Sequence, residues 1–394
     1  MTGRFLFMCQ PDHGHVIPSL AVVAELVRRG NQVTYLTSPT MAGPVTQAGA
    51  TVLPYDSIYQ DVELRKLEDD PLGLLSLFLD ESTEMLAAAG PEHRPDVIVY
   101  DLSVLHAGRI LARKWGVPAT QLIPVFASNA HFSFLSAIYA EEDGGAVAEF
   151  PGWVDGMLAR TRDLAEAHGV RADPTELWWE VQDSTLVALP RAFQFAGDTF
   201  DERFAFVGPC LGERRFLGGW EPPGDGLPIA LLSFGTVLSS RPEVFRTCVR
   251  AFAELPWRAV ITLGDGMDPA DLGALPPNVE VHRWVSHLDV LRHASVAVTH
   301  AGMGTVMETL YRGRPSVLLP ATAIDRLSAR RVEELGLGRV LDSAVLTPDR
   351  LMETVLAVAS DEGMRRAADG MRREIEAAGG TARAADVLER RLAA

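Results

Sequence analysis

Short apolar runs alternate along the chain with longer stretches in which apolar residues recur at helical spacing. The runs are rich in β-branched and aromatic residues, as buried strands are, and the longer stretches predict amphipathic helices. In the first half of the chain, we expect strands at 4–9, 32–37, 49–53, 96–100 and 119–123, with helices at 16–29 and 104–115. This alternation is typical of βαβ units, so the sequence predicts an α/β protein with doubly wound parallel sheets.

The same alternation restarts after residue 228. Glycine, proline and acidic residues crowd together over 208–228 without an apolar period, which indicates a linker. Beyond it we expect strands at 229–234, 258–263, 279–282, 296–299 and 316–319, helices at 242–254 and 304–312, and a helical tail over 348–394. The predicted organisation is a Rossmann-like domain over 1–207, a linker over 208–228, a second Rossmann-like domain over 229–372 and a final helix over 373–394.

Composition places the chain among ordinary globular proteins. Hydrophobic residues make up 47% and charged residues 22% of its 394 residues, which is too apolar for a disordered chain. Acidic side chains outnumber basic ones by 52 to 36, and the net charge of −16 repels phosphate backbones and anionic lipid. We therefore expect neither nucleic acid nor a membrane as a partner.

Short sequence signals indicate a protein of the reducing cytoplasm. The apolar run at 5–9 is too short for a signal peptide, and no apolar stretch approaches the ~18 residues that span a bilayer. Cys9, Cys210 and Cys248 lie far apart, which suggests neither a disulfide framework nor a zinc site. The predicted location is cytoplasmic.

The loop after the first predicted strand carries a candidate general base. It places His15 at the start of a helix and at the carboxyl end of a strand, where ligands bind in open α/β sheets. The positive end of the helix dipole favours the neutral imidazole, which suits a general base. The alternative is that His15 only caps the helix or packs on the sheet.

Asp101 directly follows the fourth predicted strand and also lies at a carboxyl end. A carboxylate there can accept a hydrogen bond from one imidazole nitrogen, fix the tautomer and stabilise the imidazolium. The alternative is that Asp101 is the N-cap of the helix that follows, since Asp is a favoured capping residue.

A glycine-containing segment over 299–308 is a candidate site for a diphosphate. Gly302 and Gly304 let the backbone approach an anion, and free amides at the helix start can bind phosphate oxygens. His300 and Thr305 add donors, and Glu308 can accept hydrogen bonds from ribose hydroxyls. The alternative is that the small residues only permit close packing of the helix on the sheet.

Two further segments could complete a nucleotide site. Trp284 follows a strand and could stack on a nucleobase, although a lone tryptophan is more often part of a core. Ser233, Gly235 and Thr236 end the first strand of the second half and could donate to a diphosphate, or form only a tight turn. Because the chain has no D-x-D triplet, Walker A loop or H-E-x-x-H pair, no metal is expected.

Taken together, these segments resemble the inverting glycosyltransferases of the GT-B fold, specifically the bacterial branch that decorates macrolides, enediynes and related antibiotics. The likeness runs over nearly the whole chain. It rests on residues 14–20, 99–101, 206–209, 279–285, 299–308 and 379–385. The resemblance implies two Rossmann-like domains that face each other across a cleft, with a final helix that returns to the N-terminal domain.

The resemblance also implies roles for individual residues. His15 and Asp101 would form the catalytic pair. The implied donor-binding residues are Gly14, Ser233, Gly235, Thr236, Trp284, Val285, His300, Ala301, Gly302, Met303, Gly304, Thr305, Glu308, Asp325 and Arg326. The implied acceptor pocket takes in the variable segment 56–85 and the aromatic residues Phe126, Phe132, Phe134, Tyr139 and Trp153.

Two positions depart from the pattern of the family. Many relatives have Pro-Gln where this chain has Ser286 and His287, so its contacts to the base and ribose are expected to differ. Many also have Asp-Gln, a pair that holds sugar hydroxyls, at the positions of Asp325 and Arg326.

The sequence therefore predicts a metal-independent, inverting hexosyltransferase with no cofactor besides its nucleotide-sugar co-substrate. It would move a sugar, with a deoxysugar consistent with the branch, from a TDP- or UDP-sugar to a hydroxyl of a hydrophobic natural product. The expected partners are the donor and this small-molecule acceptor, and a homodimer is compatible with the sequence. Two alternatives stay open: a nucleotide-sugar epimerase, and a non-catalytic protein that binds an NDP-sugar or an antibiotic.

Overall fold

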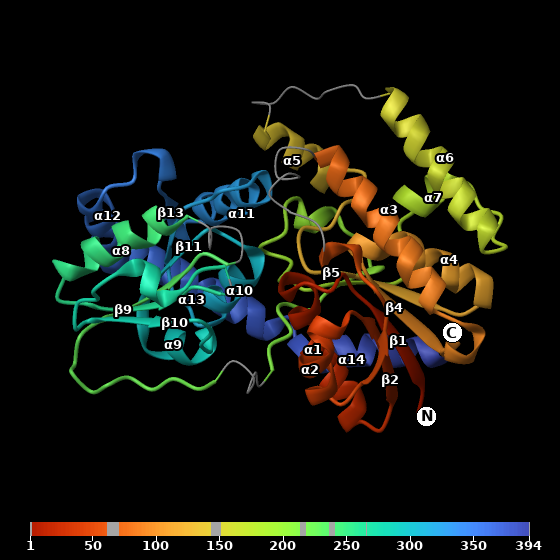
Figure 1. Cartoon of the computed structure of the whole chain (residues 1–394), viewed down its shortest axis with the longest axis horizontal. Helices are drawn as coiled ribbons and strands as arrows, with labels where there is room; N and C mark the ends of the chain where they lie inside the picture. The colour runs from red at the N-terminus through yellow and green to blue at the C-terminus, as the bar shows by residue number, and fades with distance from the viewer. Residues whose placement is uncertain are drawn as a thin grey trace. The chain divides into compact units, whose positions relative to one another are not determined.

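The structure, a computed structural model, describes residues 2–60, 71–142, 151–212, 218–235, 241–264 and 266–393. Contacts within the chain define two compact units. The first comprises Met1–Phe134, Ala146–Gly212 and Ala378–Ala394, and the second comprises Leu135–Gly145 and Glu213–Ala377. Each unit has its own parallel sheet and its own helices (Figure 1). The predicted α/β class with two doubly wound sheets is therefore confirmed.

The first unit is built on a seven-stranded sheet in the order β3-β2-β1-β4-β5-β6-β7, and every neighbouring pair is parallel. The strands are β1 Arg4–Met8, β2 Gln32–Thr37, β3 Thr51–Pro54, β4 Val97–Asp101, β5 Ala119–Ile123, β6 Thr185–Val187 and β7 Phe204–Phe206. Strands β2 and β3 are added on one side of β1, and strands β4 to β7 are added on its other side. The strand order thus reverses between β1 and β4.

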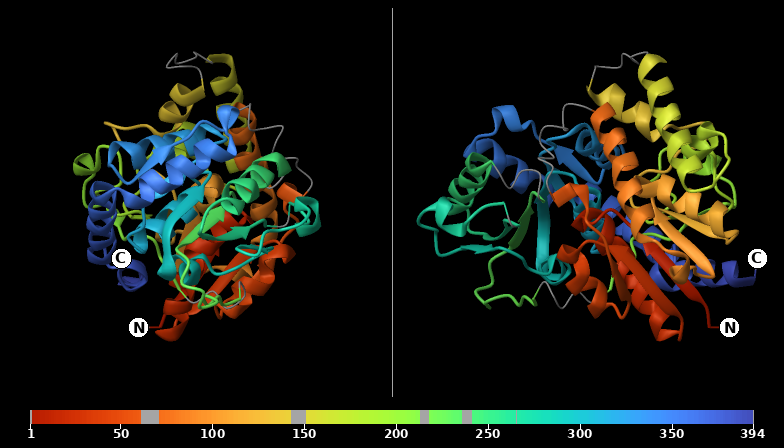
Figure 2. Two further views of the ribbon diagram at one scale, coloured as in Figure 1. Left: turned by 90° about the vertical axis from the view of Figure 1, so that its left-hand side faces the viewer. Right: turned by 45° about the vertical axis from the view of Figure 1, so that its right-hand side comes forward.

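Helices cover both faces of this sheet (Figure 2). They are α1 His13–Arg28, α2 Ala42–Gln47, α3 Pro71–Ala88, α4 Leu105–Trp115, α6 Pro151–Ala167, α7 Pro174–Trp179 and α14 Gly380–Arg390. On one face, buried Leu6 and Ile98 belong to a core cluster with residues of α3, α4, α6 and α7. On the other face, the hydroxyl of Tyr35 lies 2.7 Å from Ser19 Oγ on α1.

Hydrogen bonds link α14, near the end of the chain, to the residues that directly follow α1. Arg29 donates to Asp386 at 2.6 Å and to Glu389 at 2.8 Å, and Asn31 donates to Glu389 at 2.8 Å. The predicted final helix over 373–394 is wrong at its start, because α13 (Glu362–Ala377) continues through residue 373 and the last helix begins at Gly380. Gly379, with a φ of 88°, separates the two helices.

The second unit is built on a six-stranded parallel sheet in the order β10-β9-β8-β11-β12-β13. Its strands are β8 Ile229–Ser233, β9 Arg258–Thr262, β10 Val279–His282, β11 Ala294–Thr299, β12 Ser316–Leu318 and β13 Gly338–Val340. Its helices are α8 Pro242–Ala253, α9 His287–His293, α10 Met303–Tyr311, α11 Ala323–Glu334, α12 Pro348–Ser360 and α13. Here the strand order reverses between β8 and β11.

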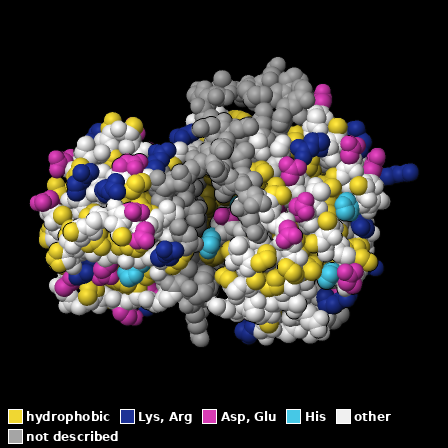
Figure 3. Space-filling view, in the orientation of Figure 1, with side chains coloured by type: hydrophobic (Ala, Val, Ile, Leu, Met, Phe, Trp, Pro, Cys, Tyr) yellow, Lys and Arg dark blue, Asp and Glu magenta, His cyan; other side chains and the backbone are white. Residues whose placement is uncertain are grey.

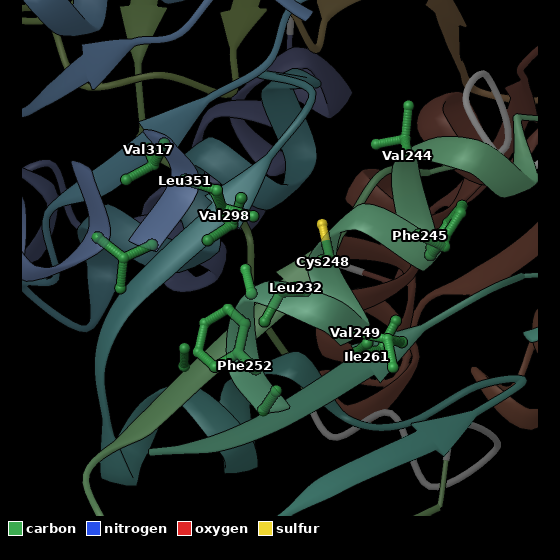
Figure 4. Packing of buried hydrophobic residues seen from close by; sticks show 14 of the residues in the cluster. Leu232, Val244, Phe245, Cys248, Val249, Phe252, Ile261, Val298, Val317 and Leu351 are labelled. Carbon is green, nitrogen blue, oxygen red and sulfur yellow. The ribbon is translucent and has the colours of Figure 1, made fainter. Parts of the chain in front are cut away.

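Helix α8 shows how the sequence pattern fills the core of the second unit. Phe245, Cys248 and Phe252 recur at helical spacing and are fully buried. They belong to one cluster with residues of β8, β9, β11, β12 and α12 (Figure 4). The amphipathic pattern therefore fixes which face of α8 packs on the sheet.

Several predicted boundaries differ from the observed ones. The first helix begins at His13 rather than at residue 16, because Asp12 caps it by accepting a hydrogen bond from Gly14 N. Strands β6, β7 and β13 are absent from the predicted elements. Each has only three residues, too few to show a period, whereas three-residue β12 lies within the predicted apolar run 316–319. Chain order also does not predict that Leu135–Gly145, with most of α5 (Phe134–Glu142), groups with the second unit.

On the face drawn in Figure 3, acidic and basic side chains are interspersed over both units. Neither sign of charge forms a continuous patch on the described part of this face. Within the described ranges, no helix is long and apolar enough to cross a lipid bilayer.

The core of the second unit predicts a large cost for removing Phe252. Phe252→Ala leaves a cavity in a closed cluster, so we expect the free energy of unfolding to fall by about 3–5 kcal/mol. Leu356→Ala on α12 is the matched control, because this leucine is 42% exposed and its loss should cost about 0.5 kcal/mol or less. Urea denaturation of both variants tests this, and equal losses would contradict the packing.

Candidate active site

Both sheets carry predicted site residues at the point where their strand order reverses. At such a point, adjacent loops leave the carboxyl ends of neighbouring parallel strands in opposite directions and open a crevice for a ligand. In the first unit, His15 follows β1 and Asp101 ends β4. In the second, Gly235 follows β8 and His300 follows β11. The topology therefore gives each unit one candidate site.

The site of the first unit is a His–Asp pair. His15 Nδ1 lies 2.8 Å from Asp101 Oδ1, and Asp101 is fully buried while the His15 side chain is 26% exposed. Met8 of β1 is in register with Tyr100 of β4. Asp101, the next residue of β4, is therefore level with the loop that leads from β1 into the helix α1. The structure thus brings together the two residues that the sequence singled out.

Asp101 also caps the turn that follows it. Its Oδ1 accepts from Ser103 N at 2.8 Å and from Ser103 Oγ at 2.6 Å, so capping and contact with His15 occur together rather than as alternatives. Since an ionised carboxylate can only accept, the contact places the proton of neutral His15 on Nδ1. Nε2 is then an acceptor, and none of the described residues hydrogen-bonds to it.

The charge state of His15 differs from the expectation based on the helix dipole. Burial lowers the pKa of His15, but the charge of Asp101, the hydrogen bond to it and the charge of Asp12 together raise that pKa to about 9. Asp12, the N-cap of α1, is itself an anion at the positive end of the helix, so it offsets the dipole. The shift in the pKa of His15 is therefore opposite in direction to the one expected from the helix dipole. The role of Asp12 was missed, although an Asp at an N-cap is a visible sequence signal.

The site of the second unit centres on His300, which two glycines frame. A Cβ on Gly302 would lie 2.4 Å from His300 Nε2, and one on Gly235 would lie 2.7 Å from His300 Cε1. His300 is only 7% exposed, and its Nδ1 has no hydrogen-bond partner among the described residues. A side chain at either glycine would therefore clash with the His300 ring. The ring keeps a buried nitrogen, Nδ1, that could bind a ligand.

Helix α10 begins beside this histidine. Ala301 has a φ of 73°, a conformation that costs a residue with a Cβ energy and that concentrates at functional sites. Gly302 is the N-cap, and no described side chain caps the helix. Met303, Gly304 and Thr305 form the first turn, so their amides are available to an anion.

Trp284 and Val285 follow β10 near the same edge. Val285 is buried, whereas Trp284 is partly exposed, so its ring is not simply core. A Cβ on Gly264 would lie 3.9 Å from Trp284 Cη2 and 3.9 Å from Gly235 O, which links the loops after β8, β9 and β10. Gly264 is not among the residues predicted from the sequence, although a glycine directly after a strand is a signal for such a role.

Glu308 is buried and already holds a partner. Its Oε2 lies 3.1 Å from His287 Nδ1, and His287 Nε2 lies 3.2 Å from Thr262 Oγ1. Glu308 stands in the second turn of α10. His287 stands at one of the two positions that depart from the family pattern. It contacts Glu308, whose carboxylate is predicted to bind the ribose.

Asp325 and Arg326 begin α11 and make local contacts. Asp325 accepts from Thr322 N at 3.0 Å in a capping box. Arg326 donates from Nε to the carbonyl of Glu141, at 3.3 Å, and from Nη1 to Ala321 O. The guanidinium that replaces the usual amide therefore contacts α5 within the second unit.

The remaining predicted residues are only partly brought together. Ser233 is buried at the end of β8, and the amide of Gly14 donates to Asp12 at 2.6 Å. Thr236 and the side chain of Trp153 lie outside the described residues.

Three of the predicted acceptor aromatics form one cluster. Phe126 is fully buried and contacts Phe132, Phe134 and two residues that the sequence analysis missed, Phe193 and Phe195. Phe126 is therefore a core residue beneath the more exposed Phe132 and Phe134. Tyr139 groups instead with the second unit.

Two Rossmann-like units, one with a His–Asp pair and the other with a glycine-framed histidine at the strand reversal, define an α/β enzyme of the GT-B class. Residues 247–390 match the family "Erythromycin biosynthesis protein CIII-like, C-terminal domain". The chain is 38% identical to demethyllactenocin mycarosyltransferase of Streptomyces fradiae, over 98% of this chain and 86% of that protein. It is 36% identical to oleandomycin glycosyltransferase of Streptomyces antibioticus, over 97% and 89%.

A solved structure shows the same likeness. The calicheamicin glycosyltransferase CalG4 is 40% identical, covers 100% of this chain and 99% of its own, and superposes with a TM-score of 0.85. The chain therefore belongs to the antibiotic-tailoring family of GT-B glycosyltransferases, and it is an enzyme. The alternatives of an epimerase or a non-catalytic binding protein are not favoured.

The contact between His15 and Asp101 predicts a pH-dependent contribution to stability. Because the pKa of His15 is higher in the folded protein than in the unfolded chain, the pair stabilises the fold fully below pH ~6.5 and ceases to do so as the pH rises through about 9. This contribution is at most about 3 kcal/mol.

An NMR titration measures the pKa directly. We expect about 9 for wild-type His15 and a value below 6.5 in Asp101→Asn, where burial remains but the carboxylate charge is gone. Denaturation at pH 6 and pH 9.5 should show the wild type losing this stabilisation. A wild-type His15 that titrates below 6.5 would contradict the pairing.

Proposed function

We propose that the protein transfers a sugar, with inversion at the anomeric carbon, from a TDP- or UDP-sugar to a hydroxyl of a hydrophobic natural product. The observation that carries the proposal is the contact between His15 and buried Asp101 at the strand reversal of the first unit. It gives a base whose free nitrogen, Nε2, is not occupied by any described residue. The relatives' names support an antibiotic aglycone as the acceptor.

The base acts in its neutral form. Nε2 takes the proton of the acceptor hydroxyl as the oxygen bonds to the anomeric carbon, and the bond from that carbon to the diphosphate breaks. Asp101, held by Ser103, stabilises the imidazolium that results. Attack opposite the leaving diphosphate inverts the anomeric carbon.

The second unit supplies groups for the leaving diphosphate. His300 Nδ1 is buried without a described partner, and the amides at the start of α10 point in the direction that favours anions. In this proposal Trp284 stacks on the base, and Glu308, which contacts His287, binds the ribose. We propose that these groups, with Thr236 and Thr305, stabilise the charge that develops on the diphosphate without a metal.

The test is a transfer assay with TDP- and UDP-sugars and hydroxylated polyketide acceptors in the presence of EDTA. His15→Ala should lose about 10²–10⁴-fold in kcat/KM, as expected for loss of a general base, with unchanged binding of TDP measured by calorimetry. His168→Ala is the matched control and should keep wild-type activity. Full activity in His15→Ala would refute the base assignment, and loss of activity in EDTA would refute metal independence.

The charge state of His15 predicts the pH profile of the reaction. Because only neutral His15 accepts a proton and its pKa is about 9, kcat/KM of the wild type should rise with pH up to about 9. In Asp101→Asn the pKa of His15 falls, so the rising limb should move to lower pH while the plateau drops. A limb that stays in place in this variant would show that another group titrates.

A further inference from the structure

The Ser103 hydroxyl contacts the carboxylate of the His–Asp pair, and the mechanism above does not use it. Ser103 Oγ donates to Asp101 Oδ1 at 2.6 Å, which is shorter than the 2.8 Å between His15 Nδ1 and the same oxygen. The Ser103 amide also donates to Oδ1, at 2.8 Å. Three donors therefore converge on one oxygen of the carboxylate.

The second oxygen of this carboxylate takes no part in these contacts. Asp101 Oδ2 is buried and has no hydrogen-bond partner among the described residues. A carboxylate oxygen offers roughly two lone pairs, so three donors on Oδ1 must share its charge. The Ser103 hydroxyl and the His15 imidazole thus compete for one oxygen instead of each holding its own.

The surrounding fold holds the hydroxyl in this position. Ser103 lies in the short turn Leu102–Val104 between β4 and α4 and is only 1% exposed, so water does not compete for its hydrogen bond. Val104 and Tyr100 belong to one buried core cluster, and a Cβ on Gly108 of α4 would lie 2.2 Å from Tyr100 Cγ. Helix α4 therefore packs directly on the end of β4, and the turn between them is fixed.

Other ionisable side chains around the pair stay uncharged at neutral pH. Three of them interact with the charge of Asp101, and burial is the main reason that the pKa of each is raised above its ordinary value. They are Cys9, Tyr35 and Tyr59. Asp12 is the other charged group that acts on His15. A titration near neutral or mildly alkaline pH at this site is therefore expected to report on His15.

We propose that Ser103 is a positioning residue whose hydroxyl takes up part of the charge of Asp101 Oδ1 and so limits how firmly the carboxylate holds the imidazolium of His15. This inference rests on the proposed function and adds the control of its base. Because less charge is left for the imidazolium, His15 returns to its neutral, proton-accepting form at a lower pH than it would beside Asp101 without the hydroxyl.

The experiment removes the hydroxyl and keeps the amide. In Ser103→Ala, the midpoint of the NMR titration of His15 should move up by about half a pH unit, because Asp101 gives its full charge to the imidazolium. The rising limb of kcat/KM should move up equally, which lowers kcat/KM about threefold at neutral pH. Ser103→Cys, whose thiol is a weak donor, should show a smaller shift in the same direction. TDP binding measured by calorimetry should match the wild type in both variants.

Ser184→Ala is the matched control. Ser184 is also buried, and its hydroxyl lies 3.0 Å from Thr120 Oγ1 of β5, in the same sheet as Asp101. This variant likewise loses one buried hydrogen bond, so its Tm should fall by a similar amount. Its His15 midpoint and its pH profile should match the wild type.

The direction of the shift decides the outcome. If the hydroxyl only capped the turn, its loss would loosen the contact between Asp101 and His15, and the midpoint would stay or move down, as in Asp101→Asn. Either result in Ser103→Ala would overturn the proposal, and so would an equal upward shift in Ser184→Ala. The NMR titration needs no turnover. If the midpoint moves up while the wild type transfers no sugar, the proposed function fails and the effect of Ser103 on His15 stands.

Discussion

The constraint on which the rest of the structure depends is the reversal of strand order in each all-parallel sheet. Parallel strands end at one edge, and only where the order reverses do two neighbouring loops diverge and leave room for a ligand. The chain places His15 and Asp101 at the reversal between β1 and β4, and Gly235 and His300 at the reversal between β8 and β11. Each unit therefore carries its chemistry at the one place where its topology can hold a small molecule.

Within the first unit, the chemistry depends on how anions surround one imidazole. Asp101 is buried, and none of the described arginines or lysines pairs with it. The hydrogen bonds from Ser103 and His15 offset part of the cost of its burial. Together with Asp12 it makes His15 a strong base that rests protonated at neutral pH.

In the second unit, the candidate site depends on the close approach of the backbone to a ligand. His300 fits between Gly235 and Gly302, where a Cβ on either glycine would collide with its ring. Ala301, which joins His300 to Gly302, adopts a left-handed conformation. The amides at the start of α10 are left for an anion. The glycines of this segment therefore leave room for the His300 ring, and they also leave backbone amides exposed to an anion.

The sequence by itself determined the α/β class and most strand positions, because these depend on local periodicity. It marked His15 and Asp101 as residues that follow strands, each with a structural alternative, and their pairing was implied by the resemblance to the family. It did not predict the strands β6, β7 and β13, the role of Gly264 or the cluster of Phe126 with Phe193 and Phe195. Those depend on contacts between segments far apart in the chain. Tertiary structure alone also decided the protonation of His15, since its pKa reflects the approach of Asp101, which is 86 residues away.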